Sequence, residues 1–178
     1  MTSQQDDNEW LKRYIRDIPD FPKEGVMFKD ITPLLGDKKA FSYTIDTIAA
    51  RYDGVKVDKV LGVEARGFIV AAPVAYRFGA GLIPVRKQGK LPWEIETQEY
   101  ELEYGAELLE MHRDAIAPGE KILIVDDVLA TGGTAEAAAH LTARCGGLVA
   151  GMAMIMELTF LKGRSRLSQH EVFSLISY

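Results

Sequence analysis

The chain has 178 residues, of which 47% are hydrophobic and 26% are charged, and its formal net charge at pH 7 is -5. This length and hydrophobic content fit one domain that buries a substantial core. The acidic balance provides no overall attraction to nucleic acid, which would need a local basic patch, so we expect no nucleic-acid partner.

The start of the chain and its cysteine content bear on location. Residues 1–10 are polar and acidic and lack the basic start and apolar run of a signal peptide. No window approaches the apolar length of a membrane span. The single Cys145 excludes an internal disulfide framework and a multi-cysteine zinc site. We therefore expect a cytoplasmic protein that does not engage a membrane.

The first third of the chain predicts two helices around a packed loop. Residues 8–18 carry apolar side chains at helical spacing and predict a short amphipathic helix. Residues 19–35 are interrupted by prolines and a glycine but keep several large apolar side chains, which predicts an ordered loop. Residues 36–52 predict a helix with Asp37 near its N-cap, and residues 58–63 predict a strand.

Further along, helical and strand patterns alternate. The predicted helices and strands, in chain order, are a helix at 65–79, strands at 81–86 and 121–127, a helix at 134–146 and a strand at 148–158. Strands that are apolar on both faces and separated by helices indicate a parallel sheet covered on two sides. We therefore expect an α/β fold with ligands at the carboxyl ends of the strands.

Residues 87–120 depart from this alternation. They begin as a polar loop with glycine and proline and continue as two alternating segments that meet at residues 104–106. This pattern predicts a mobile loop carried on a β-hairpin.

The segment ILIVDDVLATGGT, residues 122–134, is the most informative stretch. An apolar strand ends at Asp126 and Asp127, and a turn of small residues then leads into a helix. Backbone N–H groups of such a turn, threonine hydroxyls and a helix N-terminus suit a monophosphate. Carboxylates beside that cradle can accept hydrogen bonds from sugar hydroxyls, so the predicted ligand is a sugar phosphate. The plainer alternative is that the two aspartates only cap a turn.

This segment resembles the phosphoribosyl diphosphate motif of the type I phosphoribosyltransferases, and its LATGGT ending is most similar to the adenine phosphoribosyltransferases. The similarity covers nearly the whole chain, because further segments fall where the family's motifs do: DFPKEGVMFKDITPLL, GVEARGF, VRKQGKLP, ELEYG and ELTFLKGRSRL. The resemblance implies the type I fold, with a mostly parallel central sheet flanked by helices, a flexible β-hairpin loop and a small N-terminal hood. It implies one domain over 1–178, with an N-terminal helix and base-recognition hood at 1–36 and a mobile catalytic loop and hairpin at 87–106.

The implied reaction transfers ribose 5-phosphate from phosphoribosyl diphosphate to N9 of adenine and yields AMP and diphosphate. The resemblance further implies a homodimer, with Arg86 and Lys87 acting across its interface. Mg²⁺ would be bound mainly through diphosphate and ribose oxygens, without dedicated protein ligands.

The resemblance also implies a role for each matching residue. The residues expected to contact the sugar hydroxyls and the 5-phosphate are Asp126, Asp127, Ala130, Thr131, Gly132, Gly133 and Thr134. Those expected at the diphosphate are Glu64, Ala65, Arg66, Arg86, Lys87 and Lys90, with a non-proline cis peptide in the first turn. For adenine they are Met27, Phe28 and Lys29, with the Phe28 ring stacking on the base. Glu103 is expected to exchange the proton at adenine N7, Tyr104 to close the site, and the catalytic set to be Glu103, Asp126, Asp127 and Arg66.

Two positions differ from the usual family residues. Glu64 stands where aspartate is frequent, and Gln88 stands where proline is frequent. From the residues alone, plainer explanations also remain: a surface ion pair for Arg66, core filling for Phe28 and an outward strand position for Glu103.

Two other functions remain open. Transfer to hypoxanthine or guanine would favour a Lys or Asp after the phosphate cradle, whereas residues 151–159 are mostly apolar. A phosphoribosyl diphosphate sensor that regulates transcription would need a nucleic-acid face, which this acidic chain lacks. The histidines at 112, 140 and 170 share no metal-ligand spacing.

Overall fold

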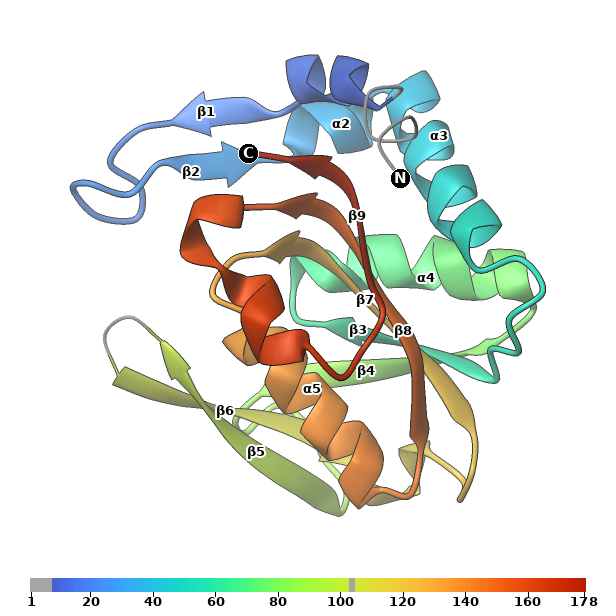
Figure 1. Ribbon diagram of the computed structural model, residues 1–178. Helices are drawn as coiled ribbons and strands as arrows, with labels where there is room; N and C mark the ends of the chain where they lie inside the picture. The colour runs from blue at the N-terminus through green and yellow to red at the C-terminus, as the bar shows by residue number, and fades with distance from the viewer. Residues whose placement is uncertain (1–7, 103–104) are drawn as a thin grey trace.

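The computed structural model describes residues 8–102 and 105–178. A seven-stranded sheet with strand order β5-β6-β4-β3-β7-β8-β9 forms its centre. Figure 1 shows this sheet with helices on both faces and a separate two-stranded sheet beside it. The main strands are β3 (Lys59–Val63), β4 (Gly81–Lys87), β7 (Lys121–Leu129), β8 (Leu148–Glu157) and β9 (Val172–Ser177).

These five strands are parallel, in agreement with the predicted α/β class. The hairpin strands β5 (Ile95–Leu102) and β6 (Gly105–His112) are antiparallel to each other, and β6 pairs antiparallel with the end of β4. The predicted hairpin is therefore present. Its last pair is Leu102 opposite Gly105, so Gly105, predicted as part of the joint at 104–106, already belongs to β6; residues 103 and 104 lie outside the described residues.

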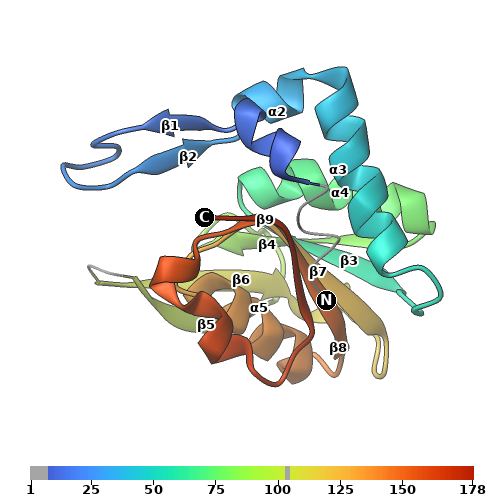
Figure 2. The same ribbon diagram turned by 45° about the horizontal axis from the view of Figure 1, so that its top comes forward.

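Each face of the sheet has its own hydrophobic core. Along β7, Leu123 and Val125 pack with the cluster under α3 and α4, and Ile122 and Ile124 pack with the cluster under α5. All four side chains are fully buried, because successive residues of a strand point to opposite faces. Figure 2 shows the helices on the two sides: α3 (Lys38–Arg51) and α4 (Arg66–Phe78) on one, α5 (Gly133–Arg144) on the other.

The N-terminal segment differs from the prediction of one helix over 8–18. A short 3-10 helix, η1 (Glu9–Tyr14), is followed by the strand β1 (Arg16–Ile18). β1 pairs antiparallel with β2 (Phe28–Asp30), which lies in the predicted loop, and the helix α2 (Thr32–Gly36) follows. The apolar spacing of 8–18 predicts a helix, but pairing with β2 satisfies the backbone of its second half instead.

Other predicted elements match closely. The Asp37 side chain accepts a hydrogen bond from the Ala40 backbone N–H at 2.8 Å and caps α3, as expected. β7 continues to Leu129 rather than ending at the aspartates. The elements that follow β8 were not predicted: η3 (Thr159–Leu161), η4 (Gly163–Leu167) and β9. A short 3-10 turn, η2 (Arg113–Ala115), follows the hairpin.

Within the described ranges, no helix combines the length and the apolar character that crossing a membrane requires.

Candidate active site

The strands that lead to Glu64 and to Asp126, β3 and β7, are neighbours in the sheet. β3 pairs in parallel with β7, with Gly62 opposite Val125. Because parallel strands end at the same edge, Glu64 and Asp126 lie in one region. In Figure 1 the β1–β2 pair lies above this edge and the β5–β6 hairpin lies below it. The fold therefore gathers the predicted site residues that the structure describes around one edge.

The aspartate pair is close to a guanidinium from α4. Asp127 is 4% exposed, and its Oδ2 lies 2.9 Å from Nη2 of Arg66. That contact lacks hydrogen-bond alignment, so among the described residues this buried oxygen has no hydrogen-bond donor. Asp126 uses Oδ1 to accept the backbone N–H of Asp127 at 2.9 Å. The pair therefore retains acceptor capacity for a ligand.

Burial is the main cause of the raised pKa values of these two aspartates. Burial, followed by the adjacent Asp127, raises the pKa of Asp126 well above its ordinary value. Burial also raises the pKa of Asp127, although the Arg66 guanidinium opposes this shift. Two neighbouring carboxylates that the surrounding protein compensates poorly favour a partner that brings hydrogen-bond donors or positive charge.

A glycine brings α4 against this pair. A Cβ at Gly67 would lie 2.6 Å from Oδ1 of Asp126 and 3.3 Å from the carbonyl oxygen of Val125. Only a residue without a side chain therefore lets the first turn of α4 approach β7 this closely. This approach also brings Arg66, the first residue of α4, within reach of Asp127.

The turn between β7 and α5 has the features of an anion cradle. Gly132 has φ +87°, which favours glycine, and it precedes the first turn of α5. Since this N-cap residue has no side chain, it leaves the first N–H groups of the helix available for an anion. Thr131 and Thr134 are half-buried on either side of the two glycines. The five predicted cradle residues therefore form one turn at the helix N-terminus: Ala130, Thr131, Gly132, Gly133 and Thr134.

Glu64 lies among the predicted diphosphate-binding cations. The peptide bond between Glu64 and Ala65 is cis, as the resemblance implies. Oε2 of Glu64 accepts hydrogen bonds from Nε of Arg86 and from the backbone N–H of Lys87, each at 3.2 Å, and Oε1 pairs with Nζ of Lys90. Burial acts to raise the pKa of Glu64, but the hydrogen bonds from Lys90 and Lys87 outweigh it, so the net shift is downward. An acidic side chain thus occupies the centre of the basic cluster.

The Lys87 side chain points to the hairpin. Its Nζ lies 2.8 Å from Oε2 of Glu107, which also accepts the Tyr100 hydroxyl at 2.7 Å. These two hydrogen bonds lower the pKa of Glu107. One of the predicted diphosphate ligands is therefore held by β6.

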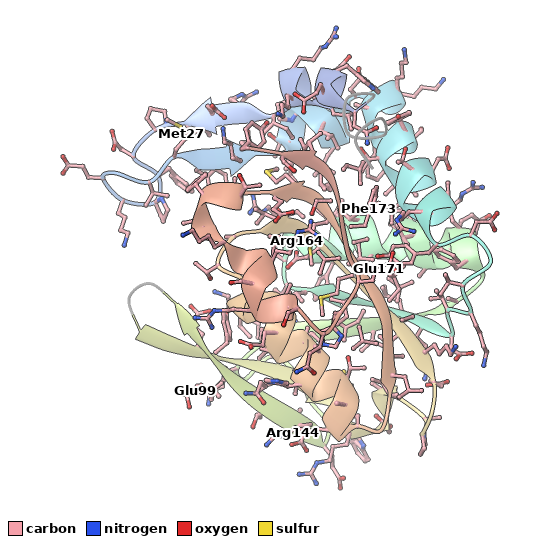
Figure 3. All side chains as sticks on the ribbon, viewed as in Figure 1. Met27, Glu99, Arg144, Arg164, Glu171 and Phe173 are labelled. Atoms are coloured by element: carbon pink, nitrogen blue, oxygen red, sulfur yellow. The ribbon has the colours of Figure 1, made fainter. Side chains whose placement is uncertain are left out.

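The predicted base-binding residues lie on and beside β2. The Phe28 ring is 4.8 Å from the Arg66 guanidinium carbon and contacts the Phe21 ring edge-on, with centroids 5.0 Å apart. The Lys29 carbonyl accepts a hydrogen bond from Nη1 of Arg66 at 3.3 Å. Met27 is exposed on the β1–β2 pair, as Figure 3 shows. Arg66 therefore bridges the base segment and the aspartate pair.

Glu103 and Tyr104 lie outside the described residues, so their predicted roles stay predictions. Two residues already described, Gly67 and Glu107, were not predicted. Nor was Glu110, whose Oε2 accepts the Gly89 N–H at 2.9 Å, or Gly163, whose backbone meets the cradle turn. A glycine inside a helix-starting motif is a usable signal for Gly67. The two glutamates offered none, because a glutamate within a predicted strand is ordinarily expected to face solvent, and only the tertiary structure shows that Glu110 is 3% exposed.

The chain matches the phosphoribosyl transferase domain model over residues 35–175. The adenine phosphoribosyltransferase of Roseiflexus sp. (strain RS-1) is 57% identical over 168 residues, which cover 94% of this chain and 98% of that protein. The chain belongs to the adenine phosphoribosyltransferase family. Two solved structures of adenine phosphoribosyltransferases extend the comparison. The structure from Thermoanaerobacter pseudethanolicus is 52% identical with a TM-score of 0.94, and the match covers 96% of this chain and 99% of that chain.

The second solved adenine phosphoribosyltransferase, from Saccharomyces cerevisiae, is 39% identical with a TM-score of 0.89, and the match covers 95% of this chain and 98% of that chain. The type I phosphoribosyltransferase fold expected from the resemblance is thereby confirmed. In the described part of this family member, no group of three or more His, Cys, Asp or Glu side chains is placed to hold a metal ion.

Proposed function

We propose that this chain is a purine salvage enzyme that transfers ribose 5-phosphate from phosphoribosyl diphosphate to N9 of adenine, forming AMP and diphosphate. The buried Oδ2 of Asp127 carries the proposal, because it has no described hydrogen-bond donor and lies on the strand that leads into the anion cradle. Sugar hydroxyls beside a bound 5-phosphate would supply the missing donors. The Saccharomyces cerevisiae relative supports a sugar-phosphate site next to a base site, since it was solved with an imino-altritol bisphosphate and adenine.

The proposed step breaks the bond between C1 of the ribose and the diphosphate oxygen, and forms a bond from C1 to N9 of adenine. The electron pair of the broken bond leaves with diphosphate. Positive character at C1 is stabilised by the nearby carboxylates Asp126 and Asp127. Arg66, Arg86, Lys87 and Lys90 would bind the leaving group, and Glu64 and Ala65 form the turn beneath it.

The proton released by adenine needs an acceptor. We assign this exchange, at N7, to Glu103, and closure of the site to Tyr104; both assignments come from the family resemblance. The mobile loop and hairpin over 87–106 and the hood over 1–36 are likewise part of the proposal.

Mg²⁺ is the proposed cofactor. The aspartate pair fits this cofactor indirectly, because the buried carboxylate oxygen of Asp127 would accept a hydrogen bond from a ribose hydroxyl whose oxygen binds the ion. The ion would be held mainly by diphosphate and ribose oxygens, and when bound it neutralises charge on the leaving group.

We also propose that the protein is a homodimer. The outer face of α4 supports this, because Ile69 and Tyr76 project from one side of that helix and are 45% and 86% exposed. Leu82 on the adjacent β4 is 45% exposed. An apolar face of this kind favours burial against a second chain, and Arg86 and Lys87 lie at the end of β4, where they would act across the interface. The cytoplasmic location remains a prediction from the sequence.

The alternatives are another purine base and a non-catalytic sensor. Purified protein with phosphoribosyl diphosphate and Mg²⁺ is offered adenine, hypoxanthine, guanine, xanthine or orotate separately, and nucleotide products are separated by chromatography. We expect AMP alone. Another nucleotide would contradict the adenine assignment and keep the phosphate cradle. No product, with phosphoribosyl diphosphate still bound, would favour the sensor, and salt-dependent retention on nucleic acid would then test that alternative.

A further inference from the structure

The ammonium group of Lys29 is held in place by two partners. Its side chain is 12% exposed, and Nζ lies 2.7 Å from Oδ1 of Asp17 on β1. The same Nζ lies 3.9 Å from the centroid of the Tyr178 ring. A mostly buried cation needs such partners, because burial without them is costly. The base-binding strand β2 is therefore tied both to β1 and to Tyr178.

Tyr178 is itself fixed to the large sheet. It follows β9, its backbone N–H donates to the Glu157 carbonyl at 2.9 Å, and its carbonyl oxygen accepts the Thr159 N–H at 2.9 Å. Burial, followed by the nearby Asp17 and Glu9, raises the pKa of the Tyr178 hydroxyl to about 12. The side chain therefore meets Lys29 as a neutral aromatic ring on a rigid support.

The position of the β1–β2 pair depends on contacts such as that of Lys29 with Tyr178. β1 and β2 form their own two-stranded sheet, which is not part of the seven-stranded one. An isolated two-stranded hairpin is marginally stable at best. In Figures 1 and 2 this pair extends away from the large sheet, and the end of the chain after β9 lies beside β2.

The contact between Lys29 and Tyr178 is connected to the aspartate pair through Arg66. Lys29 meets Tyr178 with its side chain and Arg66 with its backbone carbonyl, and Arg66 in turn lies 2.9 Å from Asp127. A displacement of Lys29 thus moves β2, including Phe28, relative to the aspartate pair.

We propose that Tyr178 is a positioning residue for the base site: its ring holds Lys29 and thereby sets the distance between β2 and the sugar-phosphate site. The consequence for adenine rests on the proposed function, whereas the consequence for the order of residues 16–30 does not.

The test compares Tyr178→Leu with Tyr178→Phe. The phenylalanine variant keeps an aromatic face and should behave as the wild type. The leucine variant should raise KM for adenine roughly 2- to 30-fold, with little change in KM for phosphoribosyl diphosphate. Amide hydrogen exchange in residues 16–30 should rise in the leucine variant without any substrate present. Lys12→Met is the matched control, because Nζ of Lys12 lies 5.0 Å from the centroid of the same ring and Lys12 is not part of β2.

A double-mutant cycle tests whether Lys29 transmits the effect. Lys29→Met combined with Tyr178→Leu should be no worse than Lys29→Met alone. Unchanged exchange in residues 16–30 in the leucine variant would overturn the proposal, as would equal rises in KM for both substrates. If the leucine variant does not fold, Lys29→Met must raise exchange in residues 16–30 more than Asp17→Asn does, because both variants lose the ion pair to β1 but only Lys29→Met loses the contact with the Tyr178 ring. Absence of AMP formation by the wild type would refute the proposed function, and the exchange measurement would still decide the role of Tyr178.

Discussion

At the scale of single residues, the site holds two carboxylate groups in opposite situations. Asp127 is buried with one oxygen lacking a described hydrogen-bond donor, whereas both oxygens of Glu64 are occupied by cations of the basic cluster. The first arrangement leaves acceptor capacity for a ligand. The second places the protein's own negative charge where diphosphate is proposed to bind.

For Asp127, we expect Asp127→Asn to reduce activity far more than stability. Loss of hydrogen bonds to a charged acceptor should lower kcat/KM by roughly 10- to 150-fold. Removal of one of two adjacent like charges relieves repulsion and offsets the lost ion pair with Arg66, so the melting temperature should change little. Steady-state kinetics and thermal unfolding check this. Equal losses of activity and stability would instead support the view that the aspartates only cap a turn.

For Glu64, we expect Glu64→Gln to tighten diphosphate binding, because Arg86 and Lys90 lose a competing anion. Partly exposed ion pairs of this kind predict a gain of about two- to tenfold in affinity. Calorimetric titration with diphosphate and Mg²⁺ measures it, with the exposed Glu99→Gln as control. Weaker binding would mean that Glu64 mainly organises the cations.

At the scale of elements, the backbone of η4 packs against the cradle turn, residues 130–134. A Cβ at Gly163 would lie 2.1 Å from the Ala130 carbonyl oxygen and 2.8 Å from the Gly132 N–H nitrogen. Arg164, labelled in Figure 3, pairs with Glu157 at the end of β8 and donates to the Val172 carbonyl at 2.6 Å. The backbone of Gly163 therefore contacts that of the cradle turn, and Arg164 fixes η4 to β8 and β9.

We expect Gly163→Ala to displace the cradle turn and raise KM for phosphoribosyl diphosphate. Overpacking against backbone should also cost about 1–3 kcal/mol of unfolding free energy. Gly36→Ala is the matched control, because no atom lies within 4 Å of its added Cβ. Kinetics and denaturant unfolding of both variants decide the matter. If the two variants behave alike, η4 does not support the cradle.

At the scale of the whole molecule, the apolar face of α4 bears on assembly. Placing a charge in a buried interface is costly, so Tyr76→Glu should convert the proposed dimer to monomers. Activity should fall with it if Arg86 and Lys87 act across the interface. Light scattering measures the mass, and Leu148→Glu, at another exposed apolar position, is the control. A wild-type protein with the mass of one chain would contradict the dimer.

The sequence alone was enough for features that depend on local pattern and side-chain type. Alternation along residues 122–125 places them on two buried faces of a parallel strand, and the adjacent Asp126 and Asp127 with the following glycines indicate a sugar-phosphate site. The strand prediction is confirmed because strand periodicity follows from short-range backbone geometry. The sugar-phosphate assignment stays a prediction, which follows from the groups that a helix N-terminus and adjacent carboxylates present.

Only the tertiary structure decided the contacts between distant segments. Pairing with β2 turned Arg16–Ile18 into a strand, the close approach of Gly163 to Ala130 set the back of the cradle, and the Tyr178 ring met Lys29. None of these contacts has a local signature, because each depends on how the sheet brings together residues far apart in the chain. The sequence therefore determined which chemical groups the site contains, and packing determined how they are held.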